Sequence, residues 1–116
     1  MQKGIVIGWS PVAELFAHMV KAYGFECDLF AEATYHLREI DGLNFAQYDF
    51  LVVTYWRYYN AVVKIKALNP KIRIWFCNTW DEKLSQMALE SGAMVCNPPQ
   101  GIKLFKNWLE GYLNLN

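Results

Sequence analysis

Residues with binding chemistry follow the most apolar segment of the chain. The stretch DFLVVTYWRYYN, residues 49–60, passes from a strand-like apolar run into a hydroxyl group, several aromatic rings and one guanidinium: Thr54, Tyr55, Trp56, Arg57 and Tyr58. Aromatic side chains and arginine are enriched in the binding hot spots of protein surfaces. No carboxylate stands at the end of the apolar run, where open parallel sheets usually place their sites. The stretch therefore indicates binding rather than catalysis.

Two further tryptophans, Trp9 and Trp80, also come just after predicted strands. Because the carboxyl ends of parallel strands meet at one edge of a sheet, we expect a rim of five aromatic rings: Trp9, Tyr55, Trp56, Tyr58 and Trp80. The rings could form a floor for a planar ligand or for the side chains of a partner. They could instead simply fill the rim by packing on one another, and this plainer interpretation is the favoured one. The sequence leaves both interpretations open.

Other candidate sites are weaker. His18 and His36 are isolated, with no cysteine or carboxylate at metal-ligand spacing. Ser10 precedes a proline and fits a helix N-cap better than a nucleophile. Gly4 and Gly8 do not form the GxGxxG pattern of dinucleotide sites. We therefore expect no metal, no cofactor and no enzymatic activity.

The elements that position these residues alternate between apolar runs of strand length and segments of helical period. This alternation is typical of repeated βα units in one three-layer domain, which would span residues 1–116. The predicted strands cover residues 3–8, 25–30, 49–55, 72–78 and 93–96. The predicted helices cover residues 11–23, 31–40, 62–68, 81–91 and 102–113.

Composition gives no sign of a nucleic-acid or membrane-surface partner, although a local basic patch could still form in the fold. Eleven basic and eleven acidic side chains cancel, so the chain lacks the overall basic charge expected of a nucleic-acid or anionic-membrane binder. No charged leader precedes the first strand, and no apolar run approaches the ~20 residues that span a bilayer. Cys27, Cys77 and Cys96 lack CxxC spacing and fall in or beside predicted strands, which indicates buried reduced thiols. We expect a cytoplasmic protein.

Several phrases of the sequence resemble the receiver domain of two-component response regulators. They are Tyr48-Asp49 ahead of a hydrophobic strand, LNP at residues 68–70, WDEKLSQMALESGA at residues 80–93, and Pro98 after the fifth strand. The resemblance covers essentially the whole chain and is most specific in its second half. It implies a flavodoxin-like three-layer sandwich, with five helices around a five-stranded parallel sheet of order 2-1-3-4-5.

The resemblance also implies a phosphorylation site, and here its chemistry is missing. A working receiver needs acids after strand one to hold Mg²⁺, an acceptor aspartate ending strand three, a Ser or Thr after strand four and a lysine after strand five. The matching positions carry neutral side chains: Trp9, Ser10, Thr54, Asn78 and Asn97. We expect a pseudo-receiver without phosphoaspartate signalling, in which hydrogen bonds hold Thr54 and Asn78 in one arrangement.

Three classes of function fit this sequence. The preferred one is an atypical receiver-like domain that acts in signal transduction by protein–protein interaction. The alternative is a small-ligand-sensing domain that uses the aromatic rim, with Tyr55, Trp56, Arg57, Tyr58 and Trp80 as contacts. The third is an enzyme or carrier of flavodoxin-like fold, against which the missing acid/base pair counts.

The last predicted helix suggests where a partner would bind. It carries an apolar stripe that is broader than a sheet can cover: Leu104, Phe105, Trp108, Leu109 and Tyr112. Soluble monomers seldom leave large apolar patches in water. We therefore expect a homodimer through the fourth helix, fifth strand and fifth helix, with Lys103, Lys106 and Asn107 near its polar rim.

Overall fold

A computed structural model describes residues 2–8, 10–31, 44–54, 59–77, 82–90, 94–96 and 101–114. Strands and helices alternate along these residues, as the sequence predicts. The strands are β1 (Lys3–Gly8), β2 (Glu26–Ala31), β3 (Phe50–Val53), β4 (Arg73–Cys77) and β5 (Met94–Cys96). The helices are α1 (Ser10–Ala22), the 3-10 helix η1 (Phe45–Gln47), α3 (Tyr59–Leu68), α4 (Glu82–Glu90) and α5 (Gly101–Asn114).

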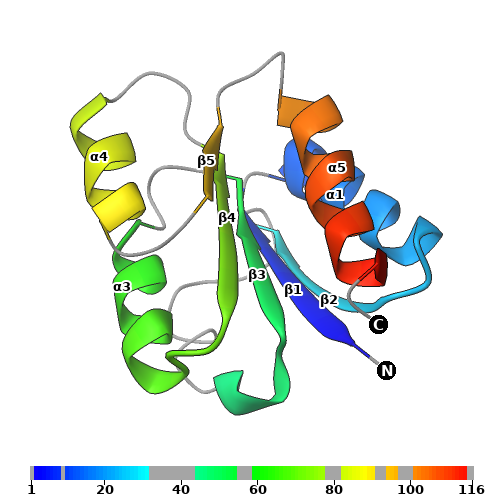
Figure 1. The fold of residues 1–116 in the computed structure, drawn as a ribbon, viewed down its shortest axis with the longest axis horizontal. Coiled ribbons are helices and arrows are strands. Elements are labelled where there is room, and N and C mark those ends of the chain that lie inside the picture. The colour runs from blue at the N-terminus through cyan, green and yellow to red at the C-terminus, as the bar shows by residue number, and fades with distance from the viewer. Residues whose placement is uncertain are drawn as a thin grey trace.

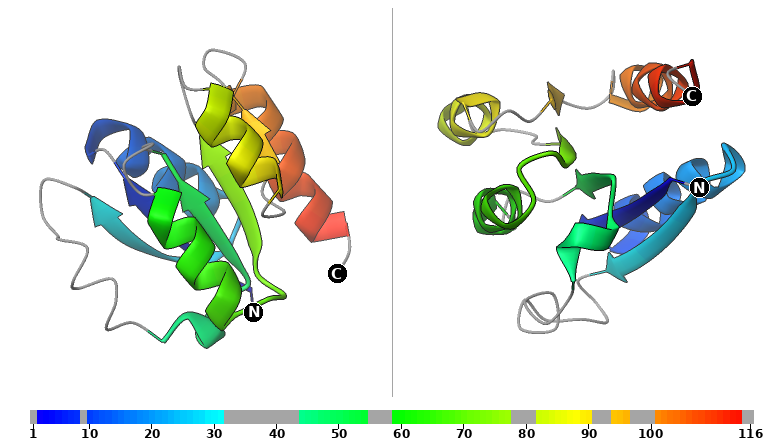
Figure 2. Two further views of the ribbon diagram at one scale, coloured as in Figure 1. Left: turned by 90° about the vertical axis from the view of Figure 1, so that its left-hand side faces the viewer. Right: turned by 60° about the horizontal axis from the view of Figure 1, so that its bottom comes forward.

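The strands form one parallel sheet in the order β2-β1-β3-β4-β5. Helices α3 and α4 lie on one side of it, and α1 and α5 lie on the other (Figures 1 and 2). The predicted α/β class, parallel pairing and strand order are thereby confirmed. The prediction of five α-helices is not: the described residues contain four, and the predicted helix 31–40 lies almost wholly outside them.

Several element bounds also differ from those predicted. Strand β3 ends at Val53, two residues early, and α3 begins at Tyr59, three residues before the predicted start. Helix α1 begins at Ser10 itself, so the expected N-cap residue is already helical. The short helix η1 was not predicted, because three residues are too few to show a helical period.

Side chains of the central strands alternate between two cores. On β1, Ile5 and Ile7 belong to the core that includes α3, whereas Val6 belongs to the core that includes α1 and α5. Strand β3 is buried along its whole length, as expected of a parallel strand covered on both faces. Its near-continuous apolar run is therefore a consequence of two-sided burial.

Aromatic rings fill the space between α5 and the sheet. Phe105 lies 5.4 Å from Trp75 and 4.6 Å from Phe16, measured between ring centroids. Trp108 completes the group, 5.7 Å from Phe50 and 5.5 Å from Trp75. These large rings fix the position of α5, because edge-to-face and stacked pairs have specific geometry.

Asn69 of the LNP phrase links the end of α3 to the segment just before β3 through hydrogen bonds. Its side-chain amide donates hydrogen bonds to the carbonyl oxygens of Phe45 and Tyr48, both at 3.1 Å. Its own carbonyl accepts from the backbone N–H of Ile72 at 3.1 Å, just before β4. One asparagine therefore positions the starts of two neighbouring strands.

Candidate functional site

The position that matches the phospho-acceptor, Thr54, lies directly after β3 and is only 8% exposed. Its backbone N–H donates to the carbonyl oxygen of Ile7 at 3.0 Å. Its hydroxyl donates to the same oxygen at 3.4 Å. The side chain therefore satisfies a backbone group of the neighbouring strand. This confirms, for Thr54, the expectation that a hydrogen bond holds it in place.

Gly8 closes this position from the side of β1. A methyl group built on Gly8 would lie 2.1 Å from the Thr54 hydroxyl oxygen and 3.1 Å from the Thr54 backbone nitrogen. The φ angle of Gly8 is +152°, a value that residues with a side chain rarely adopt. The ends of β1 and β3 thus meet so closely that only glycine fits.

Most of the predicted site lies outside the described residues. This holds for the matched positions Trp9, Asn78 and Asn97, and for the candidate contacts Tyr55, Trp56, Arg57, Tyr58 and Trp80. Ser10 is described only as the first residue of α1. The aromatic rim therefore stays a prediction, and Thr54 is the member of the site whose surroundings are established.

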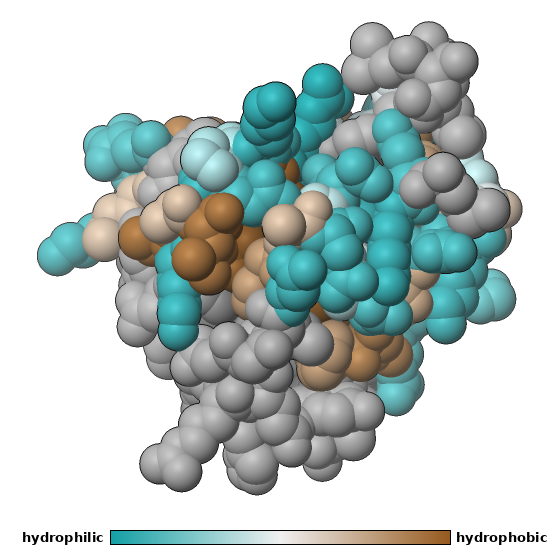
Figure 3. All heavy atoms as spheres, turned by 90° about the horizontal axis from the view of Figure 1, so that it is seen from below, coloured by the Kyte–Doolittle hydropathy of each residue, from teal (hydrophilic) through white to brown (hydrophobic). Residues whose placement is uncertain are grey.

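A charged group that the sequence did not reveal lies toward the opposite, N-terminal ends of the strands. The hydroxyl of Tyr48 donates to the Asp28 carboxylate at 2.5 Å. The ammonium of Lys3 lies 3.4 Å from the same carboxylate oxygen and 5.4 Å from the centre of the Tyr48 ring. Seen from this end, much of the described surface is hydrophilic, with smaller hydrophobic areas between (Figure 3).

Burial is the main reason that the pKa of Tyr48 lies well above its ordinary value, and the hydrogen bond to Asp28 adds to the effect. Both factors favour the neutral phenol. Tyr48 therefore remains a hydrogen-bond donor throughout the physiological pH range. Its role is to link β2 to the segment just before β3, and the described groups around it favour the neutral phenol.

Asp49 completes the links between β1 and β3. Its carboxylate accepts a hydrogen bond from the backbone N–H of Lys3 at 2.9 Å, and its own N–H donates to the Lys3 carbonyl at 2.8 Å. The Tyr48-Asp49 phrase that carried part of the resemblance is thus structural here. The Tyr48-Asp49 phrase marked these residues in the sequence, but it could not show their hydrogen-bond partners. Those partners, Asp28 and Lys3, lie 20 and 46 residues away in sequence.

The cysteines offer no reactive thiol among the described side chains. The pKa of Cys27 is raised to about 11, mainly by burial; the Lys21 ammonium opposes this shift and the Asp28 carboxylate adds to it. Cys77 is buried on β4. Within the described ranges no group of three or more His, Cys, Asp or Glu side chains is arranged to hold a metal ion.

The predicted partner-binding elements carry exposed apolar side chains. Leu89 of α4 is 52% exposed, Met94 of β5 is 53% exposed and Leu104 of α5 is 44% exposed. The predicted stripe of α5 is divided, however. Phe105 and Leu109 are fully buried in the aromatic core, whereas Leu104 stays exposed, so one side of the stripe is covered.

The residues of α5 that were predicted to lie near the polar rim of a dimer are accessible to solvent. Lys103, Lys106 and Asn107 are exposed, and Trp108 is half-buried. The side chain of Tyr112 is not among those described. None of the helices in the described ranges is long and apolar enough to cross a membrane.

Comparisons of the chain with protein-family models, with curated proteins and with solved structures give no match. The resemblance to receivers therefore rests on the sequence phrases alone.

Proposed function

We propose that the chain is an atypical receiver-like domain of flavodoxin-like fold that acts in signal transduction or regulation by contact with a protein partner. The observation that carries this proposal is the closed position of Thr54 within a sheet of order β2-β1-β3-β4-β5. A phospho-acceptor must offer a carboxylate to solvent and to a metal ion. Thr54 offers a buried hydroxyl that is bonded to the Ile7 carbonyl.

Without phosphate chemistry, the output of such a domain must come from its surface. Helix α4, strand β5 and helix α5 carry exposed apolar side chains, which favours the surface formed by these three elements as the contact surface. The side chains are Met87, Leu89, Met94 and Leu104. Contact with a second copy of the chain would remove this apolar surface from water, which is the main driving force of association. The proposed partner is thus a protein, with a homodimer as the simplest case, and the proposed location is the cytoplasm.

The alternative function, sensing of a small ligand on the aromatic rim, makes a different prediction. Trp56→Ala and Arg57→Ala would then abolish binding of a planar ligand while leaving self-association intact. If the rim contacts a protein, the same variants weaken that contact. Fluorescence titration and pull-down of these two variants distinguish the alternatives.

Phosphorylation is tested by mass spectrometry. The protein is incubated with acetyl phosphate and millimolar Mg²⁺, and its intact mass is compared with that of a working receiver treated in parallel. We expect an adduct on the control receiver and no gain of mass on this chain. A phosphorylated aspartate or glutamate in this protein would contradict the proposal.

Self-association is tested by sedimentation velocity over a wide range of protein concentration. We expect a monomer–dimer equilibrium that Leu104→Glu shifts toward the monomer. Leu68→Glu is the matched control, because Leu68 is 62% exposed on α3, outside the proposed face. The proposed homodimer would be contradicted by a wild-type protein that stays monomeric at high concentration. Equal effects of the two variants would contradict the proposed contact face.

A further inference from the structure

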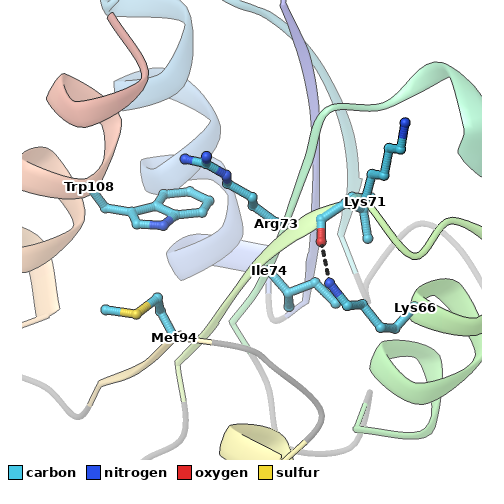
Figure 4. A pocket seen from close by; sticks show the side chains of 7 residues that line it. Lys66, Lys71, Arg73, Ile74, Met94 and Trp108 are labelled. Carbon is cyan, nitrogen blue, oxygen red and sulfur yellow. Dashed lines mark hydrogen bonds between the residues drawn. The ribbon is translucent and has the colours of Figure 1, made fainter. Parts of the chain in front are cut away.

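A cavity of about 350 Å³ lies toward the N-terminal ends of β4 and β5, away from the Thr54 position. It draws its walls from the end of α3, the segment that leads into β4, the strands β4 and β5, and α5 (Figure 4). The lining residues are Lys66, Lys71, Ile72, Arg73, Ile74, Met94 and Trp108. Such a volume is at the lower end of the range for small-molecule sites, roughly 300–1,000 Å³.

The charge of the lining is one-sided. Among the lining side chains that the structure describes, three are cationic and none is acidic. Lys66 donates a hydrogen bond to the Ile72 carbonyl at 2.9 Å, which holds its ammonium at the cavity wall. An ammonium has three N–H groups, so this bond leaves donors for a ligand. The nearby Asp49 carboxylate accepts from the backbone of Lys3 and is not part of the lining.

The opposite wall is a rigid apolar surface. The Trp108 indole is stacked on Phe105 at 5.8 Å between centroids, and it also contacts the rings of Phe50 and Trp75. Met94 adds a half-exposed thioether beside it. A platform held by other rings loses little entropy when a ligand binds, because it is already ordered.

One cationic side chain of the lining, Arg73, reaches toward the aromatic wall. Figure 4 shows the Arg73 side chain extending toward the Trp108 indole, while Lys71 points away from it. Arg73 can therefore offer a planar guanidinium next to an aromatic surface. Arginine binds carboxylates and phosphates through paired N–H groups in this plane.

We propose that this cavity binds a small aromatic acid. The acid group binds the Arg73 guanidinium on the Trp108 side of the cavity, and Lys66 adds positive charge from the other wall. The ring lies against Trp108 and Met94. The volume fits one or two fused rings and excludes a dinucleotide. This inference goes beyond the protein–protein function proposed above, because it concerns a small-molecule ligand, although the cavity shares Met94 with the proposed contact face.

The first test uses 1-naphthoate as the probe and the Trp108 indole N–H signal in nitrogen-15 NMR spectra as the readout, assigned with Trp108→Phe. We expect a saturable shift with 1-naphthoate and at least about tenfold weaker binding of the neutral analogue 1-naphthalenemethanol, since the charged hydrogen bonds are lost. Benzoate and inorganic phosphate separate the contributions of ring and anion, and both should bind more weakly. Equal binding of the neutral analogue, or no saturable shift, would overturn the proposal.

The second test uses two variants with the same change of charge. Arg73→Gln removes a lining cation from an exposed position, and we expect about tenfold weaker binding of 1-naphthoate. Lys21→Gln removes an exposed cation of α1 outside the cavity, and we expect unchanged binding. If both variants weaken binding equally, the effect is one of net charge and the cavity is not the site. Retention of the native spectrum by both variants shows that folding is not the cause.

Discussion

At the C-terminal end of β3, the described surroundings of Thr54 are neutral and closely packed, whereas toward the N-terminal ends Lys3, Asp28 and Tyr48 form a charged, hydrogen-bonded group. The difference matters because open α/β sheets normally bind ligands at the C-terminal ends of their strands. Gly8 and Thr54 lie so close together that even a methyl group on Gly8 would overlap the Thr54 hydroxyl. Polar side chains at the other end instead link the strands to one another.

The two regions should therefore respond differently to substitution. Around Thr54 the side chains are closely packed, so added atoms should lower the free energy of unfolding strongly. Removal of polar atoms there should change it little. Around Tyr48 and Asn69 hydrogen bonds join the strands, so removal of polar atoms there should lower the free energy of unfolding.

The largest expected effect is that of Gly8→Ala. The new methyl group would overlap the Thr54 side chain, and the φ angle of +152° disfavours any side chain. Overpacking and backbone strain together should lower the free energy of unfolding by about 3 kcal/mol. Urea denaturation of the variant and the wild type measures the difference.

Gly111→Ala is the matched control for this substitution. A methyl group at Gly111 meets no atom within 4 Å, and the residue lies within α5. Alanine is the better helix former, so this variant should gain about 0.5–1 kcal/mol. A Gly8→Ala protein as stable as the wild type would show that the ends of β1 and β3 are not closely packed.

The next effect is that of Asn69→Ala at the opposite end. The variant loses both hydrogen bonds from the side-chain amide to the carbonyls of Phe45 and Tyr48. At roughly 1 kcal/mol for each bond, the free energy of unfolding should fall by about 2 kcal/mol. Asn107→Ala, on the exposed surface of α5, should change it by less than about 0.5 kcal/mol. Equal losses in urea denaturation would show that Asn69 does not fasten β3.

Tyr48→Phe should have a smaller effect that depends on pH. The variant loses the hydrogen bond to Asp28, and since that carboxylate is partly exposed and can bind water, we expect a loss of about 1 kcal/mol at pH 7. The folded-state pKa of Tyr48 is raised by burial and by Asp28, so its contribution is fully present below the unfolded-state pKa, about 10, and is lost as the pH rises further.

The pH dependence is measured by urea denaturation between pH 7 and pH 11 in a Cys27→Ala background. This background is needed because Cys27, with a pKa of about 11, loses its own contribution between about pH 9 and pH 11. The Tyr48 protein should lose stability above pH 10 more steeply than Tyr48→Phe. Parallel profiles would contradict the assigned burial of the phenol.

The contrast between the two ends also explains what the sequence could predict. The strands and the central place of β3 followed from apolar runs, because two-sided burial leaves a continuous signal in the sequence. Their order in the sheet followed only from the resemblance to receivers. The link between Asp28 and Tyr48 was missed because the two residues are 20 positions apart. Asp28 lies on β2 and Tyr48 lies just before β3, and these two strands are not neighbours in the sheet. No local spacing encodes such a pair.

The same reasoning applies to the candidate sites. The replacement of the acceptor by Thr54 was visible in the sequence, but the reason that the position is closed depends on Gly8, which a motif search rejects as an isolated glycine. The cavity beside Trp108 combines residues from α3, β4, β5 and α5. Its one-sided charge could not be seen in a chain whose total charge is balanced.

The smallest expected effect is that of Thr54→Val, which removes the hydroxyl and keeps the shape. The hydroxyl bond to Ile7 is long, at 3.4 Å, and the Ile7 carbonyl keeps its 3.0 Å bond from the backbone N–H of residue 54. No buried acceptor is left unpaired, so the free energy of unfolding should change by less than about 1 kcal/mol. Self-association in sedimentation velocity should be unchanged, since Thr54 serves packing and not signalling. If the variant folds normally but no longer associates, the old acceptor position still transmits a signal to the partner face, and the two ends of the strands are coupled after all.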